Sequence, residues 1–362
     1  MNILYLTPYP FGKAPSQRFR FEFFLPLLQQ KKISFDQQAF ISEKGWNILY
    51  DQKKTVQKLS IVFIGFIRRF IILFKLNPYD FIFIHRELTP FGPPIFEWII
   101  AKAFRKKIIY DFDDAIWLPD QNKENPIWKW LKWRNKVASI CKWSYKVSTG
   151  NEYLASYAAG NNTNVVIFPT VVDTEVHKPS RENRSKKKGE RTPIIGWTGS
   201  HSTLFYLNQV LSVLQDMEKE IDFEFRVIAN RDPQLPLKNF RFIPWNKDTE
   251  IEDLNAFDIG IMPLPDDEWS KGKCGFKLIQ YLAVGIPAIA SPVGVNTQII
   301  QEGKTGFIAT SSQEWKKCLL KLLKDPSLRT ELGRNGRMFI EKNYSVMSQK
   351  KAFTELFRIN GS

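Results

Sequence analysis

The stretch SKGKCGFKLIQYLAVGIPAIASPVGVN, residues 270–296, combines a loop and two regular elements in one short run. A loop rich in lysine and glycine leads into an apolar helix that we expect to start near Phe276. Gly285 and Pro287 end that helix, and a short strand of small apolar residues follows. Backbone N–H groups at a helix N-terminus, with lysines nearby, form a site for an anion. The run therefore predicts a phosphate-binding α/β unit, although a basic surface loop before a core helix is the alternative.

Short β-branched or aromatic runs alternate with helix-length segments on both sides of this stretch, which is typical of parallel sheets built from βαβ units. The expected strands lie at 2–6, 33–39, 81–84, 107–112, 146–149, 165–168, 194–197, 223–228, 240–243, 259–262, 288–290 and 306–309. The expected helices lie at 18–30, 56–76, 94–104, 127–143, 203–217, 276–284, 295–301, 312–323 and 328–358.

A charged segment without large apolar residues, 178–192, interrupts this pattern and predicts a solvated linker or loop. We therefore expect an N-terminal α/β domain at 1–177 and a second α/β domain at 193–340. The last helical residues, 341–362, are expected to pack back on the first domain.

The run 270–296 resembles the donor-binding segment of family 4 (group 1) glycosyltransferases, where a glycine-containing loop, a helix ending in Ala-x-Gly-x-Pro and a small-residue strand follow one another. DIGIMPL, 258–264, resembles the strand that precedes this segment, and GKTGF, 303–307, resembles the turn that follows it. The resemblance implies the α/β fold called GT-B, with two facing Rossmann-like domains whose parallel sheets are flanked by helices. It also implies a glycosyltransferase that moves a sugar from a nucleotide diphosphate sugar, with retention.

The resemblance places the donor diphosphate at the loop before the 276–284 helix. Gly275 and Phe276 would begin the helix against the phosphates, and Lys273 and Lys277 would carry the balancing charge. The catalysis expected of this fold stabilises the leaving diphosphate with lysines and a helix dipole, so we expect no cofactor and no metal requirement.

Two glutamates that the family usually carries here are replaced by Gly272 and Gln280. The amide of Gln280 can still donate to and accept from the ribose hydroxyls of the donor. Gly199 and Ser200 are further donor-binding candidates, because the corresponding loop of the family approaches the phosphates. An ordinary helix N-cap in the same loop is the alternative interpretation.

Polar residues also follow the expected strands of the first half, at the edge where open α/β sheets bind ligands. Gly12 lies in the loop after the first strand, and Arg18 and Arg20 lie just beyond it. These arginines can hold a phosphate or carboxylate of the donor or acceptor, or they can be surface residues of an amphipathic helix. His85, after the strand 81–84, is a further candidate.

Asp111, Asp113 and Asp114 end another strand, and three carboxylates so close together are costly unless they face water, a cation or a polar ligand. We treat them as the catalytic candidates and expect Asp113 or Asp114 to contact a sugar hydroxyl or to activate the acceptor. An Asp-x-Asp metal motif of the other large glycosyltransferase fold and a solvated acidic turn remain the alternatives.

The composition predicts a globular protein with an anionic partner, because the 362 residues carry a net charge of +15. Three cysteines without a CxxC pair favour a reducing compartment over a disulfide or zinc scaffold. The opening MNILYLTPYP has no basic segment before it, so we expect no signal peptide, and Arg68 and Arg69 in the apolar stretch 59–76 oppose a spanning helix. We therefore expect a cytoplasmic protein.

Tryptophans mixed with lysines, Trp128, Trp130, Trp133 and Trp143, suit an anionic membrane surface, and so does the basic, apolar helix near 63–74. A core-facing aromatic stripe is the alternative. No nucleic-acid-binding motif accompanies them, so we expect no nucleic acid. The expected partners are a nucleotide sugar, a glycan or lipid-linked acceptor of cell-surface polysaccharide synthesis, and an anionic membrane. The rival hypothesis is a non-catalytic membrane-surface or nucleic-acid-binding protein on a degenerated transferase fold.

Overall fold

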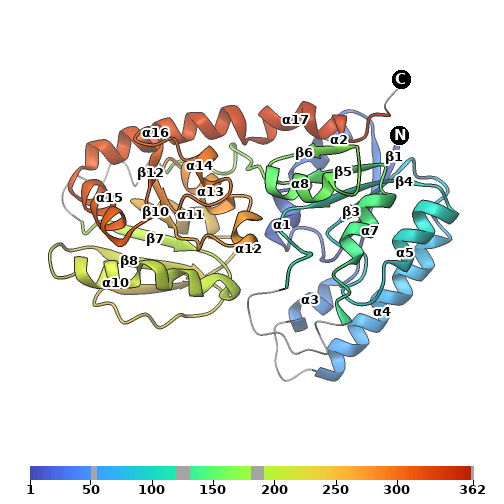
Figure 1. The fold of residues 1–362 in the computed structure, drawn as a ribbon, viewed down its shortest axis with the longest axis horizontal. Helices are drawn as coiled ribbons and strands as arrows, with labels where there is room; N and C mark the ends of the chain where they lie inside the picture. Colours follow the sequence, from blue (N-terminus) through green and yellow to red (C-terminus); the bar gives the residue numbers. More distant parts are fainter. Residues whose placement is uncertain (50–54, 120–130, 181–190, 360–362) are drawn as a thin grey trace. The chain divides into compact units, whose positions relative to one another are not determined.

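The computed structural model describes residues 1–49, 55–119, 131–180 and 191–359 and forms two compact units (Figure 1). The first unit comprises residues 1–170, 272–274 and 350–362. The second comprises residues 171–271 and 275–349. Most of the charged segment that we expect to be a linker, 181–190, lies outside the described residues.

The first unit is built on a six-stranded parallel sheet with the strand order β2-β1-β3-β4-β5-β6. Nearly every side chain of the central strands is buried, as expected when helices cover both faces of a parallel sheet. The strands are β1 (Asn2–Thr7), β2 (Ser34–Ala39), β3 (Phe81–His85), β4 (Lys107–Phe112), β5 (Lys146–Thr149) and β6 (Val165–Ile167).

The helices of this unit are shorter and more interrupted than the sequence pattern predicts. They are α1 (Pro15–Arg18), η1 (Glu22–Phe24), α2 (Leu25–Gln30), α3 (Glu43–Leu49), α4 (Thr55–Leu73), α5 (Ile95–Trp98), the π-helix η2 (Ile99–Ala103), α7 (Lys136–Trp143) and α8 (Glu152–Ala159). The helix expected at 18–30 is broken at Phe21, whose backbone φ of −143° is not helical.

In the described residues, the helix expected at 127–143 is interrupted between the helical residue Leu131 and the start of α7 at Lys136. Trp133 has a backbone φ of 47°, in the left-handed region that interrupts a helix, and its side chain is exposed. Trp128 and Trp130 lie outside the described residues. Of the four tryptophans expected in this helix, the structure therefore describes only Trp133 and Trp143.

The second unit carries another six-stranded parallel sheet, with the order β12-β11-β10-β7-β8-β9. Its strands are β7 (Ile194–Thr198), β8 (Glu224–Ala229), β9 (Phe240–Pro244), β10 (Ile259–Met262), β11 (Ala288–Ala290) and β12 (Gly306–Ile308). Its helices are η3 (His201–Leu207), α10 (Asn208–Met217), α11 (Glu250–Asn255), α12 (Glu268–Lys271), α13 (Phe276–Ala283), α14 (Asn296–Ile299), α15 (Ser312–Lys324) and α16 (Pro326–Asn343).

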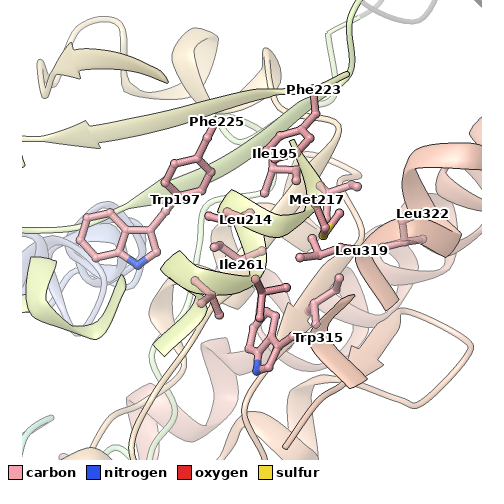
Figure 2. Packing of buried hydrophobic residues seen from close by; sticks show 14 of the residues in the cluster. Ile195, Trp197, Leu214, Met217, Phe223, Phe225, Ile261, Trp315, Leu319 and Leu322 are labelled. Atoms are coloured by element: carbon pink, nitrogen blue, oxygen red, sulfur yellow. The ribbon is translucent and has the colours of Figure 1, made fainter. Parts of the chain in front are cut away.

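The core of the second unit lies where strand side chains meet α10 and α15, as Figure 2 shows. Trp197 and Phe225 come from neighbouring strands, and Met217 and Leu319 come from the two helices. All four are nearly inaccessible to solvent. Such dense packing fixes the strand ends on which a site can be built.

The C-terminal helical stretch is also divided, into α16 and α17 (Val346–Glu355). Tyr344, with a φ of −131°, separates the two. Residues 350–359 belong to the first unit, where Phe353 stacks on Phe24 with ring centroids 4.3 Å apart. Lys146 donates a hydrogen bond to the Glu355 carbonyl there. Among the described residues, no helix is long and apolar enough to cross a membrane.

Candidate functional site

The start of α13 in the second unit requires the glycine that precedes it. Gly275 is the N-cap residue, with a φ of 67° in the left-handed region. A Cβ atom there would lie 2.1 Å from Ile299 Cδ1, so the Ile299 side chain of α14 would have to move. Because glycine has no side chain to cap the helix, the first amide groups of α13 lack a side-chain cap. This is a suitable environment for an anion.

Lys277 and the end of β7 are held beside the α13 start. The Lys277 ammonium lies 5.1 Å from the centre of the Trp197 ring, within the range of a cation–π contact. The hydroxyl of Tyr281, on α13, accepts a hydrogen bond of 3.0 Å from the backbone N–H of Thr198. Gly260 lies against the Tyr281 ring, where a Cβ atom would come within 2.4 Å. The helix and the strand end are therefore fixed to each other.

Gln280 is 2% exposed and donates its amide to a neighbour that the sequence did not single out. Its Nε2 lies 3.1 Å from Oε1 of Glu250, at the start of α11. The bond orients the amide, because the nitrogen side faces the carboxylate. A carboxylate therefore lies beside position 280 although the chain has no glutamate there.

The loop after β7 forms its own turn. Gly199 donates its backbone N–H to the Ile228 carbonyl, and a Cβ atom at this position would lie 2.4 Å from the Trp197 ring. Ser200 is the N-cap of η3, but its side chain makes no capping bond and instead lies 2.8 Å from the Ser202 hydroxyl. His201 pairs with Asn230.

In the first unit, parallel pairing brings together side chains distant in sequence. His85 pairs in register with Asp111, and Asp111 with Ser148. The His85 Nδ1 lies 2.9 Å from one Asp111 oxygen, and the Ser148 hydroxyl donates to the other at 2.8 Å. Arg20 donates to both oxygens of Asp111 and also to the Phe168 carbonyl.

This network is fully buried, since Arg20 and Asp111 are each 1% exposed. Burial alone would raise the pKa of the Asp111 carboxyl, but Arg20 and His85 more than offset it and hold that pKa well below its usual range. Asp111 is therefore a charged, hydrogen-bonded residue of the core. It fixes Arg20 and His85 in position.

A second charged cluster lies closer to the surface at the same strand ends. Arg86 donates from Nε to Asp113 and from Nη2 to Asp114, at 2.8 and 2.7 Å. Lys273, which belongs to this unit, lies 2.8 Å from the other Asp114 oxygen. Burial would raise the pKa of Asp114, but Lys273 and Arg86 lower it on balance. Asp113 and Asp114 are therefore held as partly exposed carboxylates by two cations.

The remaining first-unit candidates lie around the β1 loop. Gly12, with a φ of 72°, donates its backbone N–H to the Glu22 carboxylate at 2.9 Å. Arg18 is 7% exposed, so neither it nor Arg20 is the surface arginine of the alternative interpretation. Among the described residues, no group of three His, Cys, Asp or Glu side chains is arranged to hold a metal ion.

Glu250 was not expected from the sequence, whereas Arg86 lies in a run that was a candidate. Glu250 lies 30 residues before its partner Gln280, and only the folded sheet brings them together. Arg86 precedes the acidic cluster by 27 residues, and its backbone φ of 60° turns the chain at the end of β3. The short run His85-Arg86-Glu87 after a predicted strand was the one available signal.

Residues 229–339 match the family "Glycosyl transferases group 1". This part of the chain is similar to group 1 glycosyltransferases. It contains α13, Gly275, Lys277 and the Glu250–Gln280 pair. The family predicted from the sequence is confirmed for this region.

An uncharacterized glycosyltransferase of Methanocaldococcus jannaschii is 26% identical over 233 residues, 58% of this chain and 65% of that protein. The matched part is thus just under two thirds of that relative's length. Sucrose-phosphate synthase of Thermosynechococcus elongatus superposes with a TM-score of 0.70 at 13% identity, over 99% of this chain and 98% of that one. Anabaena HepE in complex with UDP-glucose gives 0.65 at 14% identity, over 98% of each chain. These structural similarities confirm the predicted GT-B fold.

Proposed function

We propose that this protein transfers a sugar from a nucleoside diphosphate sugar to an acceptor. The observation that carries the proposal is the α13 start, where an uncapped helix N-terminus, a left-handed glycine and a lysine meet within the group 1 domain. Preorganised positive charge of this kind stabilises a leaving diphosphate. The structurally similar HepE was solved with UDP and with UDP-glucose, which favours UDP-sugars as the first donors to test.

The donor nucleotide is proposed to lie along α13, with its diphosphate at Gly275 and Lys277. Gln280 would meet the ribose hydroxyls, and Glu250 would keep its amide oriented for that contact. Gly199 and Ser200 would border the phosphates from the β7 loop, and Lys273 would add charge.

The acceptor is proposed to bind the first unit near the carboxyl ends of β3 and β4. Asp113 and Asp114 are the polar, partly exposed side chains suited to sugar hydroxyls. Because Asp111 is buried and fully bonded, its part in the reaction would be to position Arg20 and His85. We propose further that the acceptor is a glycan or a lipid-linked acceptor of cell-surface polysaccharide synthesis and that the transfer proceeds with retention. The protein is proposed to be cytoplasmic and to lie at the inner membrane face.

Lys277→Ala is expected to weaken nucleoside diphosphate binding by about 1–3 kcal/mol, because it removes one charge-assisted contact. Isothermal titration calorimetry with UDP and GDP measures this directly. Lys317→Ala, an exposed lysine of α15, is the matched control and should bind as the unchanged protein does. Equal affinities of both variants would remove Lys277 from the donor site.

Metal chelation is expected to leave transfer intact, because the Asp113 and Asp114 carboxylates are neutralised by Arg86 and Lys273. Release of nucleoside diphosphate from a panel of nucleotide sugars is measured with and without EDTA. Activity that disappears with EDTA and returns with Mn²⁺ or Mg²⁺ would contradict this proposal. No release from any donor, together with no nucleotide binding, would instead favour a non-catalytic protein.

A further inference from the structure

Helix α4 of the first unit directs a charged side chain, that of Arg69, toward the protein interior. Arg69 is 0% exposed and donates to three backbone carbonyls, those of Leu88, Gln38 and Thr7, at 2.7 to 3.0 Å. Burial lowers the pKa of Arg69 to about 9, which still leaves it charged at neutral pH. Gly65 lets the helix approach the Phe40 ring, because a Cβ atom there would come within 2.5 Å. These contacts determine which side of α4 faces solvent.

The outward side of α4 is mostly apolar. Phe63 is 67% exposed and Phe74 is 72% exposed. The exposed residues recur every three or four positions, so they form one continuous stripe. The stripe consists of Val56, Leu59, Phe63, Ile64, Ile67, Phe70 and Ile71 of α4, and of Phe74 directly after the helix.

The neighbouring segment α5–η2 extends this stripe. Phe66 of α4 and Phe96 of α5 lie with ring centroids 6.3 Å apart, and Figure 1 shows the two helices next to each other. The exposed apolar side chains of this segment and its end are Ile95, Trp98 and Phe104. We call the α4 stripe and these three residues the apolar face. It holds eleven of the twenty exposed large apolar side chains in the described residues, so the exposure is concentrated and not scattered.

Among the described residues, the charged side chains that border the apolar face within its own segments are positive. Arg68 and Lys75 are spaced four residues from Ile64 and Ile71, at the border of the stripe. Lys102 and Arg105 are exposed beyond Trp98. Neither residues 55–75 nor residues 98–107 include an aspartate or glutamate. Glu97, which directly precedes the second of these ranges, is buried, and its carboxylate accepts a hydrogen bond from the Leu88 backbone N–H.

We infer that the apolar face docks on a lipid bilayer containing anionic lipids. Aromatic and aliphatic side chains of an amphipathic helix insert into the boundary between headgroups and acyl chains, while flanking Lys and Arg attract anionic headgroups. The cationic border distinguishes this occupant from a second copy of the chain, since two such faces would bring like charges together. The inference deepens the proposed function and rests on it in one respect: a lipid-linked acceptor would be presented at this surface.

Vesicle co-sedimentation tests the docking. The unchanged protein is expected to bind vesicles of phosphatidylcholine with phosphatidylglycerol, and to bind pure phosphatidylcholine vesicles less. Phe63→Gln/Phe70→Gln/Phe74→Gln should lower the partition coefficient about tenfold or more. The control, Ile167→Gln/Met338→Gln/Met347→Gln, removes three apolar side chains that are also at least half exposed but lie outside the apolar face, and it should bind normally.

A second pair of variants separates charge from insertion. Lys75→Gln/Lys102→Gln should weaken binding to the anionic vesicles about tenfold, and high salt should reduce the difference. Lys317→Gln/Lys324→Gln removes the same charge from α15 of the second unit and should have a much smaller effect.

The inference is overturned if the unchanged protein stays in solution with anionic vesicles, or if the triple phenylalanine variant binds as well as its control. A dimer that the same triple variant dissociates, without vesicle binding, would assign the face to a second copy. Each variant is checked for its thermal unfolding transition and for UDP binding. Vesicle binding without nucleotide binding would refute the proposed function alone, and nucleotide binding without vesicle binding would refute the docking alone.

Discussion

Asp111→Ala is expected to lower the free energy of unfolding of the first unit by about 3–5 kcal/mol, because it leaves the buried Arg20 guanidinium without its carboxylate. Hydrogen exchange followed by mass spectrometry measures the two units separately. Peptides from β3, β4 and β5 should lose protection, and peptides from β7 and β8 should keep it.

The pH dependence of this loss has a defined sign. The pKa of Asp111 in the folded protein lies below the value of about 4 for an unfolded aspartate. Its contribution to stability is therefore fully present above about pH 4 and is lost as the pH falls toward the folded value. The difference between Asp111→Ala and the unchanged protein should shrink in acid.

Asp36→Ala is the control for this prediction, since Asp36 is an exposed aspartate of the same sheet whose side chain accepts a hydrogen bond from the Tyr79 hydroxyl. It should leave the protection of β3 to β5 nearly unchanged. If Asp111→Ala behaves like Asp36→Ala, then Asp111 does not hold the strand ends together.

Local sequence patterns predicted buried strands and helix ends, because these depend on residues that are neighbours in the sequence. The β-branched and aromatic runs gave the buried strands β3 and β4, and Gly285 with Pro287 gave the end of α13. Residue types alone did not give the environment of charged side chains. Arg20 lies 91 residues before its partner Asp111, and Arg69 is enclosed by carbonyls from three separate segments.

Residue types alone also did not predict that the apolar face of α4 points outward. Its period predicts a helix with an apolar stripe, and such a stripe normally faces the core. Only the carbonyls that Arg69 binds reveal that this arginine faces inward. Helix interruptions were missed for a related reason, because the backbone at Phe21 and Trp133 departs from helical geometry without a proline or glycine to indicate it.

Gly275→Ala is expected to weaken nucleoside diphosphate binding about tenfold or more and also to destabilise the second unit. Two costs add at this position: a φ of 67° disfavours any side chain by about 1–2 kcal/mol, and the new Cβ meets Ile299 at 2.1 Å. Relief of either cost moves the first turn of α13, and with it the amide groups and Lys277 that are proposed to hold the diphosphate.

Gly303→Ala separates strain from site geometry. Gly303 has nearly the same φ, 68°, but nothing lies within 4 Å of its Cβ position. This variant should lose a similar amount of stability from backbone strain while its affinity for UDP or GDP stays unchanged. Gly275→Ala/Ile299→Ala removes the contact but not the strain, so its affinity should recover in part. Titration calorimetry on the three variants decides the matter, because equal affinity of Gly275→Ala and Gly303→Ala would show that the α13 start does not hold the nucleotide.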